Sequence, residues 1–293
     1  SLVHMKEGGI RLGATGDKNG NDVLARINDV IEAKGSSTSS LQSFAVRNAR
    51  LTLFDEVTGL NMIAPRASLV MSAKGDAIAL HADTDVSISG RTAHVKADIA
   101  LPPGKGPVKG SALITGLDPR ALAANATMFK PLRDIALSVN LATSFTVAPG
   151  ARIMAADFDM TAAGELPLTG LKGGMLHVRQ MHLNGIYDGD KNHLALDQAS
   201  IDTKQGIVRL KGGADFRYDG GKLASVGAAI TSTRIALDMP GIFAQPVGFQ
   251  ALQLNGDYQV ASRSFDIKHA SLTAPAFALS IGGTITLGEE GEA

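Results

Sequence analysis

The sequence contains no cysteine and no tryptophan, and aromatic residues make up only 4% of its 293 positions. Without cysteine there is no disulfide framework, no thiolate metal site and no cysteine nucleophile, although this absence fits several cellular compartments. Most apolar area must therefore come from Ala, Val, Ile and Leu, which contribute less area each than an aromatic ring. We expect a core that is thin and spread out.

The chain also lacks net charge and long hydrophobic runs. Basic and acidic residues both total 28, and no basic block or stripe could neutralise a series of phosphates, so we expect no nucleic-acid partner. No stretch approaches the roughly 18 apolar residues of a membrane-spanning helix, and the N-terminus lacks the pattern of a signal peptide. Residues 1–5 resemble a vector remnant. We expect residues 6–293 to be one elongated fragment of a larger protein, with a possible subdivision near residues 166–172.

The dominant pattern is a two-residue alternation of apolar and polar positions, which is typical of half-buried β-strands. It is clear from Ile78 to Ile88, and its parity reverses after Gly90. A type II′ turn at Gly90-Arg91 explains the reversal. The resulting register sets Val86 against Val95, Ala82 against Ile99, Leu80 against Leu101 and Asp85 against Lys96.

A second hairpin is predicted around Pro149-Gly150, where an alternating run that begins at Ile135 is interrupted. This register sets Phe145 against Met154, Leu141 against Phe158 and Val139 against Met160. Further strands are expected at Met175–Leu183, His193–Ile201, Ile207–Tyr218, Leu223–Thr233, Phe249–Val260, Phe265–Thr273 and Phe277–Leu287, with a hairpin turn at Tyr218–Lys222. The pattern predicts a mainly β fold, a long antiparallel meander.

Two helices are predicted, and a third short turn near Pro240–Ala244 is a candidate. The first helix spans Asn21–Lys34 and is followed by a serine-rich loop. The second begins after Asp118, which can cap it, and places Leu122, Ala126 and Phe129 on one face before Pro131 ends it. Two or three short helices cannot cover the apolar faces of about a dozen strands. Either two sheets close on one another as a sandwich, or the sheet curls around something that is not protein.

The second alternative makes the apolar positions of the two hairpins candidates for lining a groove that holds lipid. These candidates are Leu80, Val86, Ile88, Val95, Ile99, Leu101, Leu137, Val139, Leu141, Phe145, Met154, Phe158 and Met160.

Candidate chemistry is sparse. His177, His182 and His193 with Asp188 and Asp190 come closest to a metal cluster, but they lack the spacing of a metal motif, and we interpret residues 188–192 as a polar hairpin turn. His81, Asp83, Asp85 and His94 share a polar strand face, where such residues are common, and Lys96 offers Asp85 a partner. No GxSxG motif is present. We predict no catalytic residues, no metal and no cofactor, so the chain is expected not to be an enzyme.

Several motifs, taken in order, resemble the AsmA-like family. These are residues 9–12, residues 19–21, the first helix, the serine-rich loop, and a strand over residues 44–54 that ends at Asp55 with Thr58-Gly59 close behind. The helix after Leu117-Asp118-Pro119, which follows a run of strands, is similar to one in YhdP-type members. The sharp part of the resemblance covers residues 41–59.

The resemblance implies a long curled β-sheet with an open apolar groove, in a periplasmic protein anchored to the inner membrane of a Gram-negative cell. Such TamB- and YhdP-type proteins resemble bridges that carry phospholipid between the inner and outer membranes. The implied partners are phospholipid acyl chains, with inner- and outer-membrane proteins contacted through parts outside this fragment. A structural module for outer-membrane biogenesis with a closed sandwich core is the alternative.

Overall fold

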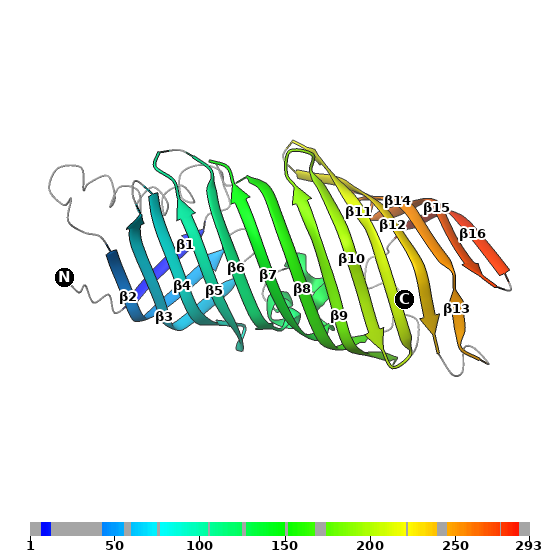
Figure 1. Cartoon of the computed structure of the whole chain (residues 1–293), viewed down its shortest axis with the longest axis horizontal. Coiled ribbons are helices and arrows are strands. Elements are labelled where there is room, and N and C mark those ends of the chain that lie inside the picture. The colour runs from blue at the N-terminus through cyan, green and yellow to red at the C-terminus, as the bar shows by residue number, and fades with distance from the viewer. Residues whose placement is uncertain are drawn as a thin grey trace. The chain divides into compact units, whose positions relative to one another are not determined.

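The computed structural model describes residues 7–12, 43–55, 60–74, 77–104, 106–124, 127–149, 152–167, 174–220, 222–238, 245–275 and 277–286 (Figure 1). The described strands are β1 Glu7–Leu12, β2 Ser43–Asp55, β3 Asn61–Lys74, β4 Ala77–Ile88, β5 Arg91–Leu101, β6 Val108–Leu117, β7 Ala136–Val147, β8 Ile153–Pro167, β9 Met175–Asp188, β10 His193–Thr203, β11 Gly206–Asp219, β12 Lys222–Leu237, β13 Val247–Phe249, β14 Ala251–Gln259, β15 Ser264–Ala274 and β16 Phe277–Thr286. Two short helical segments accompany them, α2 Pro119–Ala123 and the 3₁₀ helix η1 Thr127–Leu132.

The strands form one sheet in which neighbours follow the order of the chain, with β13 beside β12, and the sheet does not close. This confirms the mainly β, antiparallel meander, with one exception. Strand β1 pairs with β2 in parallel, and a parallel pair needs a long crossover connection. The connection, residues 13–42, contains the predicted first helix and serine-rich loop and lies outside the described residues. The turn predicted at Pro240–Ala244 and the motif residues Thr58-Gly59 lie outside them too.

The chain divides into two compact units, which are described separately below. The first comprises residues 1–153 and 165–167, and the second comprises residues 154–164 and 168–293. The chain passes from one unit to the other within β8 and at its end, so that residues of this strand belong to both units.

The first predicted hairpin is present, but its predicted turn and register were wrong. The turn residues are Ser89 and Gly90, which both have positive φ, at 50° and 79°. Two positive φ values are typical of a type I′ turn, whose twist matches that of the flanking strands. The register therefore moves by two residues, so that Val86 lies opposite Ala93 and Leu80 opposite Ile99. A shift of two keeps each side chain on its predicted face.

Other predicted strands and turns agree closely with the structure. The strands expected after residue 174 correspond to β9–β12 and β14–β16, and the Tyr218–Lys222 turn joins β11 to β12. At the turn between β7 and β8, the Ala148 N–H donates to the Arg152 carbonyl at 2.8 Å. The side-chain pairing predicted across this turn stays a prediction. Strands β3 and β6 were not identified from the sequence, because Pro65 interrupts β3 and two glycines interrupt β6.

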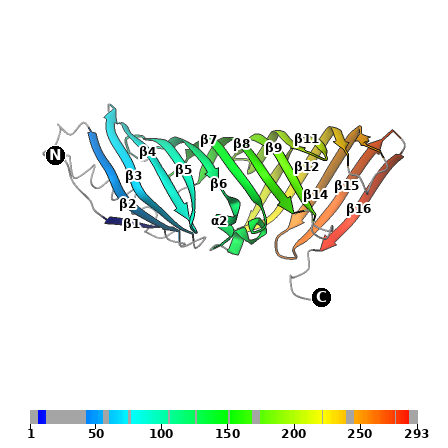
Figure 2. The same ribbon diagram turned by 90° about the horizontal axis from the view of Figure 1, so that it is seen from below.

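Helix α2 begins as the sequence predicts, with Asp118 at its N-cap and Pro119 in its first turn. The Asp118 carboxylate accepts from the Arg120 N–H at 3.0 Å and from Arg91 Nη1, at the start of β5, at 2.5 Å. The Ser89 hydroxyl donates to the Ala121 carbonyl at 2.9 Å. These bonds hold α2 against the β4–β5 turn, and the helix also contacts β7 (Figure 2). The single helix predicted here is two segments, α2 and η1.

Three phenylalanine rings cover glycines on adjacent strands. A Cβ built on Gly110 would lie 2.6 Å from Phe145 Cζ, one on Gly185 would lie 3.1 Å from Phe158 Cζ, and one on Gly256 would lie 2.9 Å from Phe265 Cζ. Each ring occupies the space that a side chain would take, and so shields backbone that glycine leaves bare. Aromatic residues are few in the chain, and at these three places a large side chain packs across neighbouring strands.

We predict that Gly185→Ala destabilises the protein by about 2 kcal/mol, because the new Cβ would overlap the Ala195 carbonyl on β10 as well as approach Phe158. Gly248→Ala is the matched control, since a Cβ there has no neighbour within 4 Å, and we expect it to change stability by less than about 0.5 kcal/mol. Chemical unfolding of the two variants measures the difference. Equal stability of both variants would contradict the packing described here.

We predict a pH-dependent loss of stability that depends on Asp118. The hydrogen bond from the Arg120 side chain, with the Arg120 N–H and the charges of Arg120 and Arg91, lowers the pKa of Asp118 below its ordinary value of 3.8, against the opposing effect of burial. Because the folded-state pKa is lowered, the carboxylate stabilises the native state above pH 3.8, and this contribution is lost as the pH falls through the folded-state pKa. Asp118→Asn should lose about 1 kcal/mol at neutral pH. In acid the Asp118 carboxylate of the unmodified chain becomes protonated and its contribution is lost. The melting temperatures of Asp118→Asn and of the unmodified chain, both measured in acid, should therefore converge.

Candidate functional site

A continuous row of apolar side chains crosses one face of the sheet in the first unit. Met71 on β3 lies opposite Leu80 on β4, Leu80 opposite Ile99 on β5, and Ile99 opposite Gly110 on β6, which lies opposite Phe145 on β7. We call this set the first apolar row. All five residues are half-buried. Parallel rows flank it, one of which joins Val95, Ile114 and Leu141.

One end of this face is covered by the helical segments. Ile88 packs with Leu60 and Ala121 of α2, and the half-buried side chains around this cluster are Met62, Val86, Leu117, Leu122 and Phe129. Leu122 of α2 and Phe129 of η1 therefore pack against the same cluster, although on two helical segments and not on the one helix face that the sequence predicted; Ala126, the third residue of that face, lies outside the described residues. Val86 and Ile88, however, were proposed to line an open groove, and the helix covers them.

The remaining groove candidates differ in exposure. Leu137 and Val139 on β7 are buried, at 7% and 8% exposed. The candidates that are half-buried outside the helix-covered cluster are Leu80, Val95, Ile99, Leu101, Leu141 and Phe145 in the first unit and Met154, Phe158 and Met160 on β8 in the second. Along β8 these methionines and Phe158 alternate with exposed residues, so their shared face is as predicted.

The second unit carries a longer row of the same kind, which we call the second apolar row. It passes from β10 to β16, and successive members lie opposite one another: Leu196, Gly212, Ile230, Leu254, Ala270 and Ile281. All are half-buried except Ile281, which is 49% exposed. A neighbouring row joins Phe216, Val226, Tyr258, Phe265 and Ile285. In the second unit, too, apolar positions of one strand therefore lie opposite apolar positions of the next.

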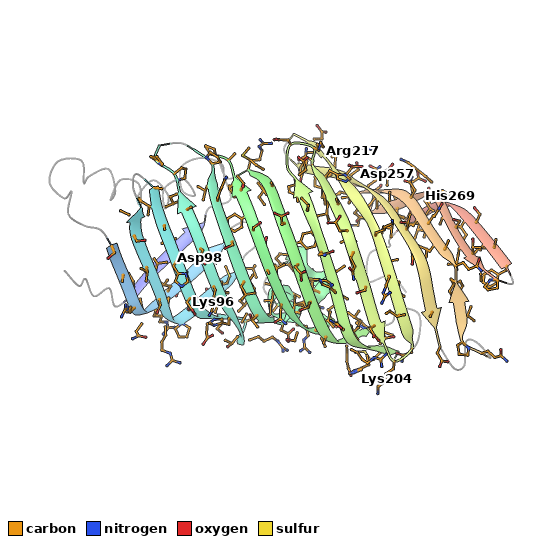
Figure 3. All side chains as sticks on the ribbon, viewed as in Figure 1. Lys96, Asp98, Lys204, Arg217, Asp257 and His269 are labelled. Atoms are coloured by element: carbon orange, nitrogen blue, oxygen red, sulfur yellow. The ribbon has the colours of Figure 1, made fainter. Side chains whose placement is uncertain are left out.

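The opposite face of the first unit is polar and carries pairs of charged side chains between strands. His81 Nδ1 lies 2.8 Å from Asp98 Oδ1. His94 lies 2.9 Å from Asp85 and 3.3 Å from Asp83. Figure 3 shows Lys96 and Asp98 on the same strand.

The partner of Lys96 differs from the prediction. Lys96 Nζ lies 3.4 Å from Asp83 Oδ2, whereas the sequence register assigned it to Asp85. The corrected turn explains the change, because the new register sets Asp83 opposite Lys96 and Asp85 opposite His94. These side chains are between 37% and 69% exposed.

The polar face of the second unit has a similar row. Its members lie opposite one another in the order Asp188, His193, Asp215, Gly227, Asp257, Asp266 and Thr284. His193 Nδ1 lies 2.6 Å from Asp215, and Lys268 pairs with the nearly buried Asp257. Each carboxylate in these pairs has a cationic or imidazole neighbour, which is how a solvated sheet face accommodates many aspartates.

The histidines and aspartates that came closest to a metal cluster do not gather at one place, although Asp188 lies opposite His193 on the neighbouring strand. His182 pairs with Asp159 at 3.0 Å, while His193 pairs with Asp215. Asp188 accepts from the backbone N–H groups of Asp190 and Lys191, and its hydrogen bond to the Lys191 side chain is the main cause of its lowered pKa. Residues 188–192 are therefore a polar hairpin turn, as interpreted from the sequence. Within the described ranges, no group of three potential ligands is placed to hold a metal ion.

An open depression on the polar face of the first unit brings together His81, Asp98, Lys109 and Ser111 from β4, β5 and β6. Ser111 lies directly opposite Asp98 in the register. In a Ser–His–Asp arrangement the hydroxyl must instead approach the second imidazole nitrogen. The grouping is therefore an extension of the polar face, with the His81–Asp98 pair at its centre.

Several apolar residues on these faces were not among the sequence candidates. Met71 was missed because β3 was not identified. Ile114 could have been found, since Val108, Ala112 and Ile114 alternate with Lys109 and Ser111. In the second unit the predicted strands showed the alternation, but the sequence did not fix the register between neighbouring strands, and so did not show which apolar positions lie opposite one another.

Comparison with known proteins found no match: no family model, no curated protein and no solved structure is significantly similar to the chain. The AsmA-like resemblance therefore rests on the sequence motifs alone.

We predict that the polar pairs of the first unit contribute little to stability. Replacing His81, Asp83, His94 and Asp98 together with alanine should leave the circular dichroism spectrum unchanged, because each exposed pair is worth only about 0.2–1 kcal/mol. The same variant should retain any bound lipid, and metal analysis should detect no stoichiometric transition metal before or after the change. A metal lost in this variant would contradict a non-catalytic polar face.

Proposed function

We propose that the chain is a non-catalytic segment that binds and conducts phospholipid in the cell envelope. The observation that carries the proposal is the first apolar row, Met71, Leu80, Ile99, Gly110 and Phe145, which crosses β3–β7 and stays half-buried. Adjacent strands lie about 4.8 Å apart, so the row extends over roughly 19 Å. An acyl chain lying along it would pass from strand to strand.

The chemistry of this surface suits a mobile apolar ligand. Burial of apolar area contributes about 25 cal/mol per Å² for the lipid and the protein alike. The row offers aliphatic carbon, a thioether and one aromatic ring, and so provides no directional bonds that would fix a ligand at one place. A tail could therefore slide, while head groups stay in water. Net direction would require an external gradient or partner.

The location and partners are proposed from the family resemblance. They are a periplasmic position, an inner-membrane anchor in the full-length protein, and transfer of phospholipid between the inner and outer membranes through contacts with proteins of both. Within the described part of the chain, no helix is both long and apolar enough to cross a bilayer.

The second candidate function is a structural or assembly module for outer-membrane biogenesis. Its closed sandwich core does not agree with the structure, in which the described strands form a single sheet that does not close.

We predict that a photoreactive side chain at Leu80 captures phospholipid and that one at His81 does not. The two positions are adjacent on β4 and project to opposite faces, so they share the same backbone environment. The experiment uses the 293-residue chain with vesicles of phosphatidylethanolamine and phosphatidylglycerol, followed by mass spectrometry of the adducts. Equal capture at both positions, or adducts with protein alone at Leu80, would contradict the proposal.

Paired aspartate variants test the same surface without a crosslinker at the site. Ile99→Asp introduces charge in the first apolar row, whereas Ala100→Asp introduces it on the opposite, exposed face of β5. Both variants should remain folded if the row is accessible to water, because a hydrated carboxylate avoids the several kcal/mol cost of burial. Capture at Leu80 should fall in Ile99→Asp and persist in Ala100→Asp. Unfolding of Ile99→Asp would favour a closed apolar core.

A further inference from the structure

The connection between β6 and β7 is longer than the sheet requires. The two strands are antiparallel neighbours, and such neighbours can be joined by a two-residue turn, as β4 and β5 are at Ser89-Gly90. The β6–β7 connection instead spans residues 118–135 and contains α2 and η1. Connections much longer than a turn often serve as lids or binding loops.

The connection begins at a break in the register and then lies over the apolar face. Pairing between β6 and β7 shifts between Ile114 and Leu117, and Gly116 has a φ of 72°, which glycine adopts without strain. Leu117 and Leu122 then pack against the cluster that contains Ile88. Chain that the sheet does not need is therefore used to cover one end of this face.

The covered positions continue the face of the first apolar row. Val86 lies opposite Ala93 and packs against the cluster that includes Ala121 of α2. Ala93 is 5% exposed, and α2 also contacts β7, where Val139 is 8% exposed. Leu80 lies on the same face of β4, about 20 Å from Val86 along the strand. One apolar face thus passes from uncovered at Leu80 to covered at Val86.

The attachment of this cover is of a kind that a lipid tail can replace. Neither α2, with five residues, nor η1, with six, is long enough to be stable without the sheet. The hydrogen bonds from Ser89 and Arg91 attach α2 and its N-cap, while Leu122 and Phe129 supply half-buried apolar packing. An acyl chain on the same strands would bury the same kind of surface.

We propose that α2 and η1 form a displaceable cover, closed in this structure, and that acyl chains compete with it for the strand positions around Val86. Opening would widen the lipid surface at that end, so the cover regulates how much of the face a lipid can occupy. This inference rests on the proposed function. Elements that open in this way have a low local stability, which hydrogen exchange measures directly.

Hydrogen–deuterium exchange of the unmodified chain tests the opening. Vesicles of phosphatidylethanolamine and phosphatidylglycerol should speed exchange in residues 119–123 by at least about twofold, because lipid stabilises the open state. Exchange in β7, which stays paired with β6, should not increase and is the internal control.

Photocrosslinking tests which positions the cover protects. Capture of phospholipid at Val86 should be at least about fivefold lower than at Leu80, since the closed state predominates. Ser89→Gly combined with Arg91→Gln removes two attachments of α2, and glycine suits the positive φ of residue 89. This double variant should raise capture at Val86 and leave capture at Leu80 unchanged. Lys109→Gln, an exposed position on β6, is the control that should change neither.

The outcomes separate the cover from the proposed function. Capture at Leu80 with unchanged or slower exchange in residues 119–123 would overturn the displaceable cover and leave lipid binding in place. Unchanged capture at Val86 in a folded double variant would do the same. No capture at Leu80 would overturn the proposed function and this inference with it. If circular dichroism shows that the double variant is unfolded, the exchange of the unmodified chain decides alone.

Discussion

The two-residue period of an extended chain is the constraint on which the rest of the structure depends. Because each strand alternates its side chains and each neighbour pairs in a register that preserves the alternation, apolar residues from β3 to β7 gather on one face. The same rule gathers them from β10 to β16 in the second unit. Every added strand therefore lengthens an apolar surface as well as the sheet, and the described helices are too short to cover it.

This constraint also explains the unusual composition. A sheet whose apolar face is only half-buried needs few large side chains, and the chain has no tryptophan and few aromatic residues. Three of the rings, those of Phe145, Phe158 and Phe265, lie over glycines of neighbouring strands. Each glycine leaves room for the ring of the neighbouring strand, and the ring shields the backbone that the glycine leaves bare. The apolar face therefore stays continuous at these places with a single layer of side chains.

Much of this could be predicted from the sequence, because alternation is a local property. The faces of Leu80, Ile99 and Phe145 followed from parity alone, and a register error of two residues in the first hairpin left them unchanged. That error arose because Ser89 adopts a positive φ, which is uncommon outside glycine, asparagine and aspartate. The cover over Val86 and Ile88 could not be predicted, since it depends on where α2 packs. That position depends on long-range bonds from Ser89 and Arg91.

The apolar faces of the two units differ in how water is kept from their ends. In the first unit, Ile88 is removed from water by Ala121 of α2 and by Leu60, so protein supplies the cover there. In the second, the row ends at Ile281, where half of the side chain is exposed and the strand edge carries no charge. A helix can end an apolar face by covering it, as Ala121 of α2 does for Ile88. The middle of the first apolar row has no such cover among the described helical segments, so a ligand is the simplest cover for it.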